Sequence, residues 1–402
     1  MSQADRYHAL DAVRAFALLA GIVLHSTLSF LPGMREGNWP ISDDSSSVFL
    51  AAVFFLVHVF RMSLFYAIAG FFTHLLLERL GVYGLIRNRL RRIALPFVVA
   101  MLVVMPLLLP PFIWAKNQLG ITGWPMIKMP IPEPQLPPWG HLWFLYLLLV
   151  LYALWLSIRA GVVTLDRRGR IMSALDRVFA AVVANPLGPA TFAVPTAVVL
   201  YFTPWWQMWS GIPAPVMGLI PNLPAVLAFG SVFGFGWFLH RQPALLDTLR
   251  IRWLRNLVAA VVLSIVAISL IGAAPKFYDF PLVRNERIAY AISYNLATWF
   301  WVFGLIGAAV RFLSAPTHHW RYLADASFYM YLVHLPVVYA LQAWMIRWPL
   351  HWSVKYALVL AITTAVLLAT YHYWVRSTFV GKFLSGRKYP RGIPGTPEAA
   401  PG

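Results

Sequence analysis

The chain of 402 residues contains no cysteine and few charged residues. Without cysteine it has no disulfide, no thiolate zinc site and no thiol nucleophile. Only 11% of its residues are charged, whereas about 25% is usual for a soluble globular domain. Together with a hydrophobic content of 60%, this scarcity excludes an ordinary water-soluble enzyme, a disordered chain and a coiled coil.

The chain contains many long apolar runs. At roughly 20 residues per membrane-spanning helix, we predict an all-α, polytopic membrane protein with about ten transmembrane helices. The predicted spans are Ala12–Leu31, Val48–Leu77, Ile93–Ala115, His141–Ile158, Thr191–Trp209, Leu223–His240, Asn256–Ala274, Ile288–Val310, Ala324–Ile346 and Val354–Val375. The fifth is the least regular, because prolines and a glycine interrupt the apolar stretch 179–195. A re-entrant or interfacial piece is the alternative there.

The formal net charge of +18 lies between the apolar runs, not on one solvated face, so we expect no nucleic-acid partner. If the N-terminus is cytoplasmic, 23 of the 32 Lys and Arg residues fall on the cytoplasmic side. The positive-inside rule then predicts that both termini are cytoplasmic, in a multi-pass protein of a plasma membrane. We expect one integral-membrane domain over residues 1–380. Residues 381–402, rich in Pro, Gly and Ala, are predicted to be a disordered cytoplasmic tail.

Two ionisable residues share one face of the first span. Arg14 and His25 are eleven residues apart, which is close to three helical turns and a rise of about 16 Å. Asp11 precedes Arg14 by three residues and is expected to pair with its guanidinium. Charged or polar side chains inside a membrane are functional candidates by default. The alternative is a snorkelling arginine and a hydrogen-bonded core histidine.

The second span and the segment after it add four more candidates. His58 and Arg61 lie within the apolar run, where an arginine requires a cavity, an acidic partner or a bound anion. A structural ion pair is the alternative for Arg61. Arg89 and Arg92, three residues apart, are neighbours on a helix that enters the membrane. Arginine forks suit phosphate recognition, although topology signals that contact anionic lipid explain such a run equally well.

Histidines recur at two later spans. His141 opens the fourth span, and Ser327, Tyr331 and His334 share one face of the ninth. His334 lies at nearly the same predicted depth as His25, which indicates a polar cavity shared by two spans. No metal-ligand spacing accompanies these histidines, so we predict no metal site among them.

Four of these segments together resemble a known family. The run LDAVRAFALLAGIVLH contains an arginine, ten residues and a histidine, through Arg14 and His25, and RLRRIALP contains an arginine-x-x-arginine motif through Arg89 and Arg92. HLWFLYLLLVLY and SFYMYLVHLP are two further matching segments. The chain is similar to the membrane-bound acyltransferase 3 family and, within it, to the OpgC-like, glucan-modifying branch. It departs at Ala69-Gly70, where family members commonly have a serine-glycine pair.

The resemblance implies O-acyl transfer from cytoplasmic acyl-CoA to a hydroxyl of an extracytoplasmic glycan, such as a periplasmic glucan, at a bacterial inner membrane. On this basis His25 and Arg14 are the expected catalytic residues, with His25 as general base. Arg89 and Arg92 are expected to bind the donor. Asp11, His58, Arg61, His141, Ser327, Tyr331 and His334 are expected to support the cavity. A covalent acyl-histidine or acyl-serine intermediate is the mechanistic alternative.

Arg61 has two roles open to it: stabilising an oxyanion, or binding the free carboxylate of an acyl group such as succinyl instead of acetyl. The expected partners are acyl-CoA, a carbohydrate or lipid-linked acceptor and membrane lipids, with no permanently bound cofactor. Two other functions compete with glycan acylation. One is an acyltransferase for a lipid or antibiotic hydroxyl, and the other is a transporter or flippase without acyl chemistry. A transporter usually has symmetric halves with discontinuous helices, and the sequence has no such symmetry.

Overall fold

The computed structural model describes residues 7–34, 39–121, 136–272, 274–275, 282–315 and 317–386. These ranges contain helices and no strand; their only bridge outside a helix joins Pro138 and Met217. The all-α prediction is therefore confirmed. The helices are α1 (His8–Thr27), α2 (Val48–Arg89), α3 (Leu95–Val103), α4 (Leu109–Leu119), α5 (Trp143–Leu165), α6 (Arg170–Ala184), α7 (Gly188–Tyr201), α8 (Leu223–Arg241), α9 (Leu245–Ile251), α10 (Trp253–Ile271), α11 (Arg284–Phe312), α12 (His318–Met345), α13 (Trp352–Thr370) and α14 (Phe379–Ser385).

Among the described residues, seven helical segments are long and apolar enough to cross a membrane, or eight if α6 and α7 form one span. The molecule is thus a polytopic membrane protein. The count differs from ten for identifiable reasons. The predicted second span and the start of the third are one helical segment, Val48–Val103, which bends at Gly81. The ninth, α12, has 28 residues but is not among the seven.

Two predicted spans differ in shape from expectation. The third is not a single helix from Ile93 to Ala115, because α3 ends at Val103 and a 3₁₀ turn at Pro106–Leu108 precedes α4. Proline lacks the backbone N–H that a continuous helix needs, so the helix is interrupted at Pro106. The fifth ends at Tyr201 instead of Trp209, and α6 and α7 meet at an angle of 108°.

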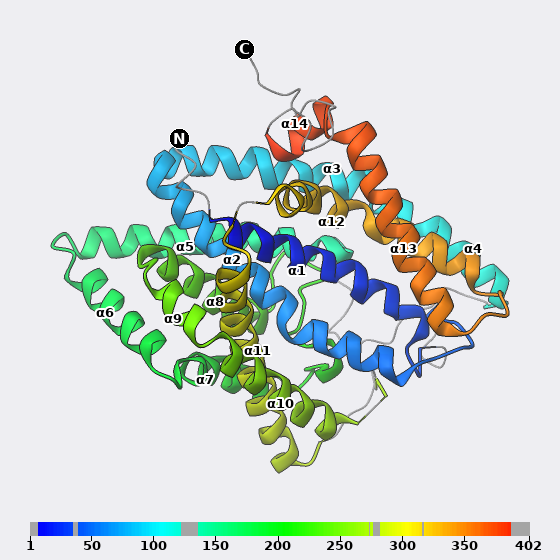
Figure 1. The fold of residues 1–402 in the computed structure, drawn as a ribbon, viewed down its shortest axis with the longest axis horizontal. Coiled ribbons are helices and arrows are strands. Elements are labelled where there is room, and N and C mark those ends of the chain that lie inside the picture. The colour runs from blue at the N-terminus through cyan, green and yellow to red at the C-terminus, as the bar shows by residue number, and fades with distance from the viewer. Residues whose placement is uncertain are drawn as a thin grey trace.

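The first helix is the central element of the bundle. It packs against α2, α11, α12 and α13, and Figure 1 shows it in dark blue, crossing the middle of the molecule beside α2. In contrast, most of the apolar surface of α10 and α13 is exposed, and Val258, Val262 and Ile265 on α10 are examples. Such apolar exteriors suit contact with lipid. The polar residues of α1 therefore face protein, which is where intramembrane polar groups are tolerated.

The parallel helices α2 and α8 approach each other at two glycines. A Cβ atom on Gly70 would lie 1.9 Å from the backbone oxygen of Phe233, and one on Gly236 would lie 1.8 Å from that of Ala67. No larger residue fits at either position without moving a helix. The two backbones are therefore held in direct contact, and this fixes the position of every side chain that α2 contributes to the interior.

The end of the chain is helical further than predicted. Residues 379–385 form α14, which carries the first part of the predicted tail 381–402. The rest of that tail, from residue 387, lies outside the described residues. Arg92 donates hydrogen bonds to the backbone oxygens of Lys382 and Phe383, at 2.7 and 3.2 Å. The π-helical turn Leu90–Ala94 that links α2 to α3 therefore lies beside the C-terminal helix.

Candidate functional site

Two cavities contain most of the predicted site residues. The first, which we call the histidine cavity, is lined by Leu24, His25, His58, Arg61, Met62, His141, Trp143, Phe144, Trp205, Gln207, Ser210, Gly211, Ile212, Pro213, Ala214, Val216, Phe229 and Tyr331. The second, which we call the arginine cavity, is lined by Arg14, Leu18, Phe65, Ile68, Ala69, Phe72, Leu76, Asn88, Arg89, Arg92, Ile93, Phe144, Leu145, Leu148, Tyr152, Ala324, Asp325, Phe328, Leu384 and Ser385. The two predicted polar groups of α1, Arg14 and His25, thus line different cavities.

Three imidazoles cluster at the histidine cavity. The ring centroid of His334 lies 5.1 Å from that of His25 and 5.6 Å from that of His141. His25 comes from α1, His334 from α12, and His141 from the turn before α5. The depth match predicted for His25 and His334 is therefore reproduced, and the two rings are neighbours although His334 does not line the cavity itself.

The hydrogen bonds of this cluster leave one nitrogen of each ring without a partner. His141 Nε2 donates to the backbone oxygen of Leu332 at 3.2 Å, and His334 Nδ1 donates to that of Tyr331 at 2.7 Å. Among the described residues, His25 Nδ1, His141 Nδ1 and His334 Nε2 are buried without a hydrogen-bond partner. Buried polar atoms are normally satisfied, so these three nitrogens leave unused hydrogen-bonding capacity beside the cavity.

Arg61 reaches the histidine cavity through a gap in α1. A Cβ atom on Gly21 would lie 2.5 Å from Nη1 of Arg61, so the absence of a side chain there lets the guanidinium pass beside α1. The described residues provide no acidic side chain within ion-pair distance of it, and its Nε is buried without a hydrogen-bond partner. The alternative of a structural ion pair for Arg61 thus has no partner in this part of the chain. Gly21 lies one helical turn before His25, which brings the cation and the imidazole to the same cavity.

His58 and Tyr331 complete the polar lining. His58 Nδ1 donates to the backbone oxygen of Phe54 at 2.9 Å, within its own helix. The hydroxyl of Tyr331 donates to the backbone oxygen of His141 at 2.8 Å, which ties α12 to the start of α5. The Tyr331 bond therefore joins two walls of the cavity, and the His58 bond orients the His58 ring.

The arginine cavity brings three guanidiniums together. Arg14 forms an ion pair with Asp11 at 3.2 Å, as the spacing predicted, and its Nη2 donates to the backbone oxygen of Ala324 at 3.4 Å. Arg89 donates to the hydroxyl of Thr73 at 3.2 Å, and its guanidinium lies 4.8 Å from the ring centre of Tyr152. Three cations around one cavity can bind an anion, and guanidinium forks suit phosphate groups in particular.

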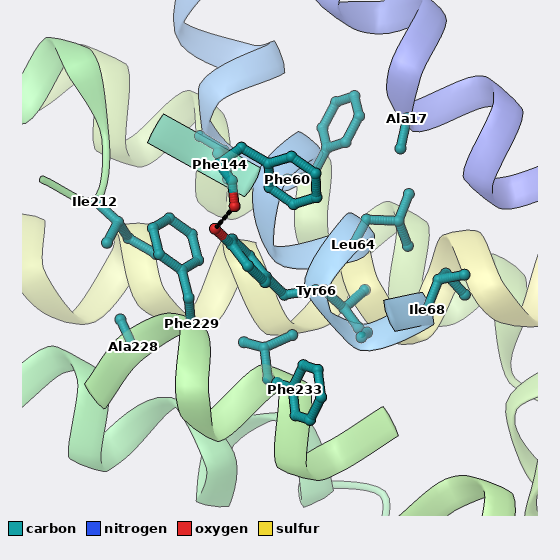
Figure 2. Close-up of a cluster of buried hydrophobic side chains, with 14 of the residues drawn as sticks. Ala17, Phe60, Leu64, Tyr66, Ile68, Phe144, Ile212, Ala228, Phe229 and Phe233 are labelled. Atoms are coloured by element: carbon teal, nitrogen blue, oxygen red, sulfur yellow. Dashed lines mark hydrogen bonds between the residues drawn. The ribbon is translucent and has the colours of Figure 1, made fainter. Parts of the chain in front are cut away.

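Phe144 is the residue that the two cavities share. Its ring packs edge-on against Phe65, with 4.3 Å between ring centroids, and against Tyr331 at 5.7 Å. Figure 2 shows the hydroxyl of Tyr66 from α2 donating to the backbone oxygen of Phe144, a bond of 3.1 Å. The position of Phe144 is therefore fixed by α2. Its ring divides a site rich in histidine from one rich in arginine.

Ser327 and Asp11 line neither cavity. Ser327 is buried, and its hydroxyl donates to the backbone oxygen of Ala324 at 2.9 Å, one turn back in its own helix. Ser327 is therefore engaged in a local bond, and a role as an acyl-serine nucleophile has no support in this geometry. Asp11 contacts a residue of the arginine cavity through its ion pair with Arg14.

One wall of the histidine cavity was missed by sequence reasoning. Residues 205–216 follow α7 as an irregular segment that contains only one 3₁₀ turn, Met208–Ser210. Trp206 Nε1 donates to the backbone oxygen of Gly211 at 2.8 Å and holds this segment in a compact loop. The apolar run at Thr191–Trp209 concealed the loop, and Pro204, Pro213 and Pro215 were the available signal against a continuous span.

Comparison with known proteins agrees with these features. Residues 7–372 match the acyltransferase 3 family, whose shared region is described as an acyltransferase domain. The chain is also 31% identical, over 156 residues, to proteins named glucans biosynthesis protein C from Escherichia coli K12 and from Shigella dysenteriae serotype 1. Each alignment covers 38% of this chain and 38% of the relative. No solved structure matches the chain. The match over residues 7–372 shows that this protein belongs to the acyltransferase 3 family and is an acyltransferase.

Proposed function

We propose that this membrane acyltransferase moves a short acyl group from cytoplasmic acyl-CoA to a hydroxyl of an extracytoplasmic glycan. The proposal sets the arginine cavity on the cytoplasmic side of a bacterial inner membrane, as the positive-inside rule favours. The observation that carries the proposal is the division of one site into two cavities of different chemistry that meet at Phe144. A donor and an acceptor on opposite sides of a membrane need such an arrangement.

The arginine cavity suits the donor. Acyl-CoA carries several phosphate groups, and Arg14, Arg89 and Arg92 supply guanidiniums at one mouth. Leu145, Leu148 and Phe328 line the same cavity and suit the apolar part of the donor arm. The donor is therefore expected to direct its thioester toward Phe144, at the boundary with the histidine cavity.

The histidine cavity suits the acceptor reaction. A sugar hydroxyl attacks the thioester carbon only if a base removes its proton, and His25 is the base that we propose. The new C–O bond forms, the C–S bond breaks, and the proton from the hydroxyl passes from His25 to the departing thiolate of CoA. His334 lies beside both His25 and His141, and each of the three rings has one nitrogen without a hydrogen-bond partner, so a relay of the proton among them is chemically feasible.

Arg61 is the proposed electrostatic element of the reaction. Its guanidinium lines the same cavity as His25 and is unpaired within the described ranges. In that position it stabilises the oxyanion formed when the thioester carbonyl is attacked. If the acyl group is succinyl instead of acetyl, Arg61 is also the cation available for its free carboxylate.

A glucan is the acceptor that we propose, on two grounds. The relatives that match part of the chain are named for glucan biosynthesis. In this chain, Trp143 and Trp205 line the histidine cavity. Their flat apolar faces and single N–H donors suit the C–H faces and hydroxyls of a sugar.

The test uses the purified full chain in liposomes with acyl-CoA labelled in the acyl group and a glucan on the opposite side. The wild-type protein is expected to transfer label to the glucan. His25→Ala should lower the transfer rate roughly 100-fold or more, which is the usual contribution of a general base. His319→Ala, at an exposed position of α12, is the matched control and should leave the rate unchanged.

Three results would count against the proposal. Wild-type transfer by His25→Ala would exclude His25 as the base. Movement of unmodified glucan across the liposome without label would favour a transporter. Label transferred to lipid, with the glucan untouched, would exclude glucan as the acceptor while keeping the acyltransferase activity.

A further inference from the structure

A third group of chemically active side chains lies outside both cavities. His74 on α2, Glu78 one turn later on α2 and His240 on α8 each present one potential ligand atom, and these three atoms lie within 4.8 Å of one another. Both imidazoles are buried, whereas the Glu78 side chain is 58% exposed. None of the three lines the histidine or the arginine cavity. The proposed acyl-transfer reaction therefore does not use these three residues.

The helix contact described above builds this group. His74 follows Gly70 by four residues, and His240 follows Gly236 by four residues. Each histidine therefore lies one turn beyond a glycine at which the two backbones touch. Because α2 and α8 run in the same direction, both imidazoles leave the contact on the same side. The close approach of the two helices is what brings His74 Nδ1 and His240 Nδ1 to 2.8 Å.

The separations within the group suit a tetrahedral metal ion. Ligands at 2.0–2.1 Å from Zn²⁺ in tetrahedral geometry lie about 3.3 Å from one another. The two Nδ1 atoms are 2.8 Å apart, His74 Nδ1 is 3.5 Å from a Glu78 carboxylate oxygen, and His240 Nδ1 is 3.9 Å from the other oxygen. Two imidazoles and one carboxylate are also a ligand set that zinc commonly takes.

The surroundings provide access and partial charge compensation. Glu78 and His240 line an open side cavity together with Tyr7, Leu75, Arg79, Arg241 and Pro243. Of the cations there, Arg241 is neutralised by Asp176, to which it donates two hydrogen bonds of 2.8 and 2.6 Å. Glu78 contributes the negative charge that a divalent ion requires. The side cavity leaves room for water at a fourth coordination position.

From this geometry we infer that His74, Glu78 and His240 form a binding site for a divalent transition metal ion of the zinc class. The ion joins α2 to α8 one turn beyond their glycine contact and completes its coordination with water from the side cavity. The bound ion would make α2 more rigid. Because α2 carries Arg61 of one cavity and Arg89 of the other, this rigidity affects both cavities.

The experiment measures metal bound by the full chain, purified in detergent through a tag without histidines. After treatment with a chelator and its removal, the protein is titrated with Zn²⁺ and passed through a desalting column before elemental analysis. We expect one Zn²⁺ per chain. Glu78→Gln should weaken binding at least tenfold, and His240→Ala should abolish it. His319→Ala, an exposed histidine on α12, is the control that should retain one ion.

Two further readings keep the inference open to refutation if His240→Ala does not fold. Glu78 is exposed, so Glu78→Gln should insert and elute as the wild-type protein does. Zn²⁺ should raise the thermal midpoint of the wild-type chain, and it should do so much less for Glu78→Gln at the same concentration. Co²⁺ should give the visible bands of a tetrahedral site. The inference would be overturned if the wild-type chain took up no Zn²⁺, or if Glu78→Gln and His240→Ala bound as much Zn²⁺ as the wild-type chain does. Either result would leave two imidazoles joined by a hydrogen bond.

Discussion

Gly21 and Arg61 are complementary: the missing side chain of the glycine on α1 is what admits the guanidinium from α2. A Cβ atom at position 21 would lie 2.5 Å from Nη1 of Arg61, well inside van der Waals contact. The end of an arginine is flexible, so α1 itself need not move when a methyl group is added. The guanidinium must move instead, and it moves at the cavity where the acyl group is proposed to react.

Gly21→Ala should therefore reduce catalysis without unfolding the protein. We expect kcat for acyl transfer to fall at least tenfold, because a single electrostatic donor aimed at an oxyanion contributes roughly 100-fold or more. The measurement is the transfer rate at saturating donor, beside the elution profile in detergent. Gly161→Ala is the matched control, since nothing lies within 4 Å of a Cβ atom there. An unchanged kcat for Gly21→Ala would show that Arg61 need not occupy its present position.

Phe144→Ala should uncouple the two cavities. Removing the ring that both cavities share opens a path for water to the thioester, so acyl-CoA hydrolysis without acceptor should rise several-fold while transfer to glucan falls. The two rates are measured as release of free CoA with and without glucan. Phe229→Ala, which widens the histidine cavity alone, should keep release dependent on glucan. Tight coupling in Phe144→Ala would argue that its ring is not the boundary.

Gly70→Ala should destabilise the membrane domain. Its new Cβ atom would lie 1.9 Å from the backbone oxygen of Phe233. Unlike a side chain, this backbone oxygen cannot move to relieve the clash unless α8 moves. We expect a loss of about 3 kcal/mol, measured as a lower thermal midpoint and a lower yield of monodisperse protein. Ala69→Ser next to it lines the arginine cavity and restores the serine-glycine pair that is common in the family. That variant should remain stable, so equal stability of the two would contradict the helix contact.

Asp43 and Lys355 form an ion pair of 2.6 Å with side chains only 4% and 3% exposed. Asp43→Asn leaves a buried ammonium without its counter-charge and should cost roughly 3–5 kcal/mol. The double variant Asp43→Leu with Lys355→Met removes both charges and should recover most of that loss. Thermal unfolding in detergent compares the three proteins. A single variant as stable as the wild-type protein would mean that Lys355 reaches solvent.

The sequence predicted those features that depend on local pattern. Long apolar runs predicted a helical membrane protein, and the run Ala12–Leu31 placed Arg14 and His25 on one helix, as observed in α1. The three-residue spacing of Asp11 and Arg14 predicted their ion pair. In each case the physical cause, helical periodicity or hydrophobicity, acts within a few turns of one element.

Apart from the proximity of His25 and His334, the features that depend on distant segments were not predicted. The loop at 205–216 begins inside the predicted span Thr191–Trp209, and its place in a cavity wall depends on its packing against distant helices. The gap that Gly21 leaves for Arg61 requires knowledge of how α1 and α2 cross. Likewise, the spacing of His74 and Glu78 is visible in the sequence, but their proximity to His240 depends on the contact between α2 and α8. The roles of the site residues remain predictions that the variants above test.

The C-terminal helix affects when the arginine cavity is completed during synthesis of the protein. Leu384 and Ser385 line the arginine cavity, and the carbonyls of Lys382 and Phe383 accept hydrogen bonds from Arg92. The arginine cavity, where we propose that the donor binds, is therefore unfinished while the ribosome is still extending the earlier helices into the bilayer. A product released before α14 would carry His25 and Arg61 in place, yet it would lack one side of the enclosure in which the thioester is proposed to dock.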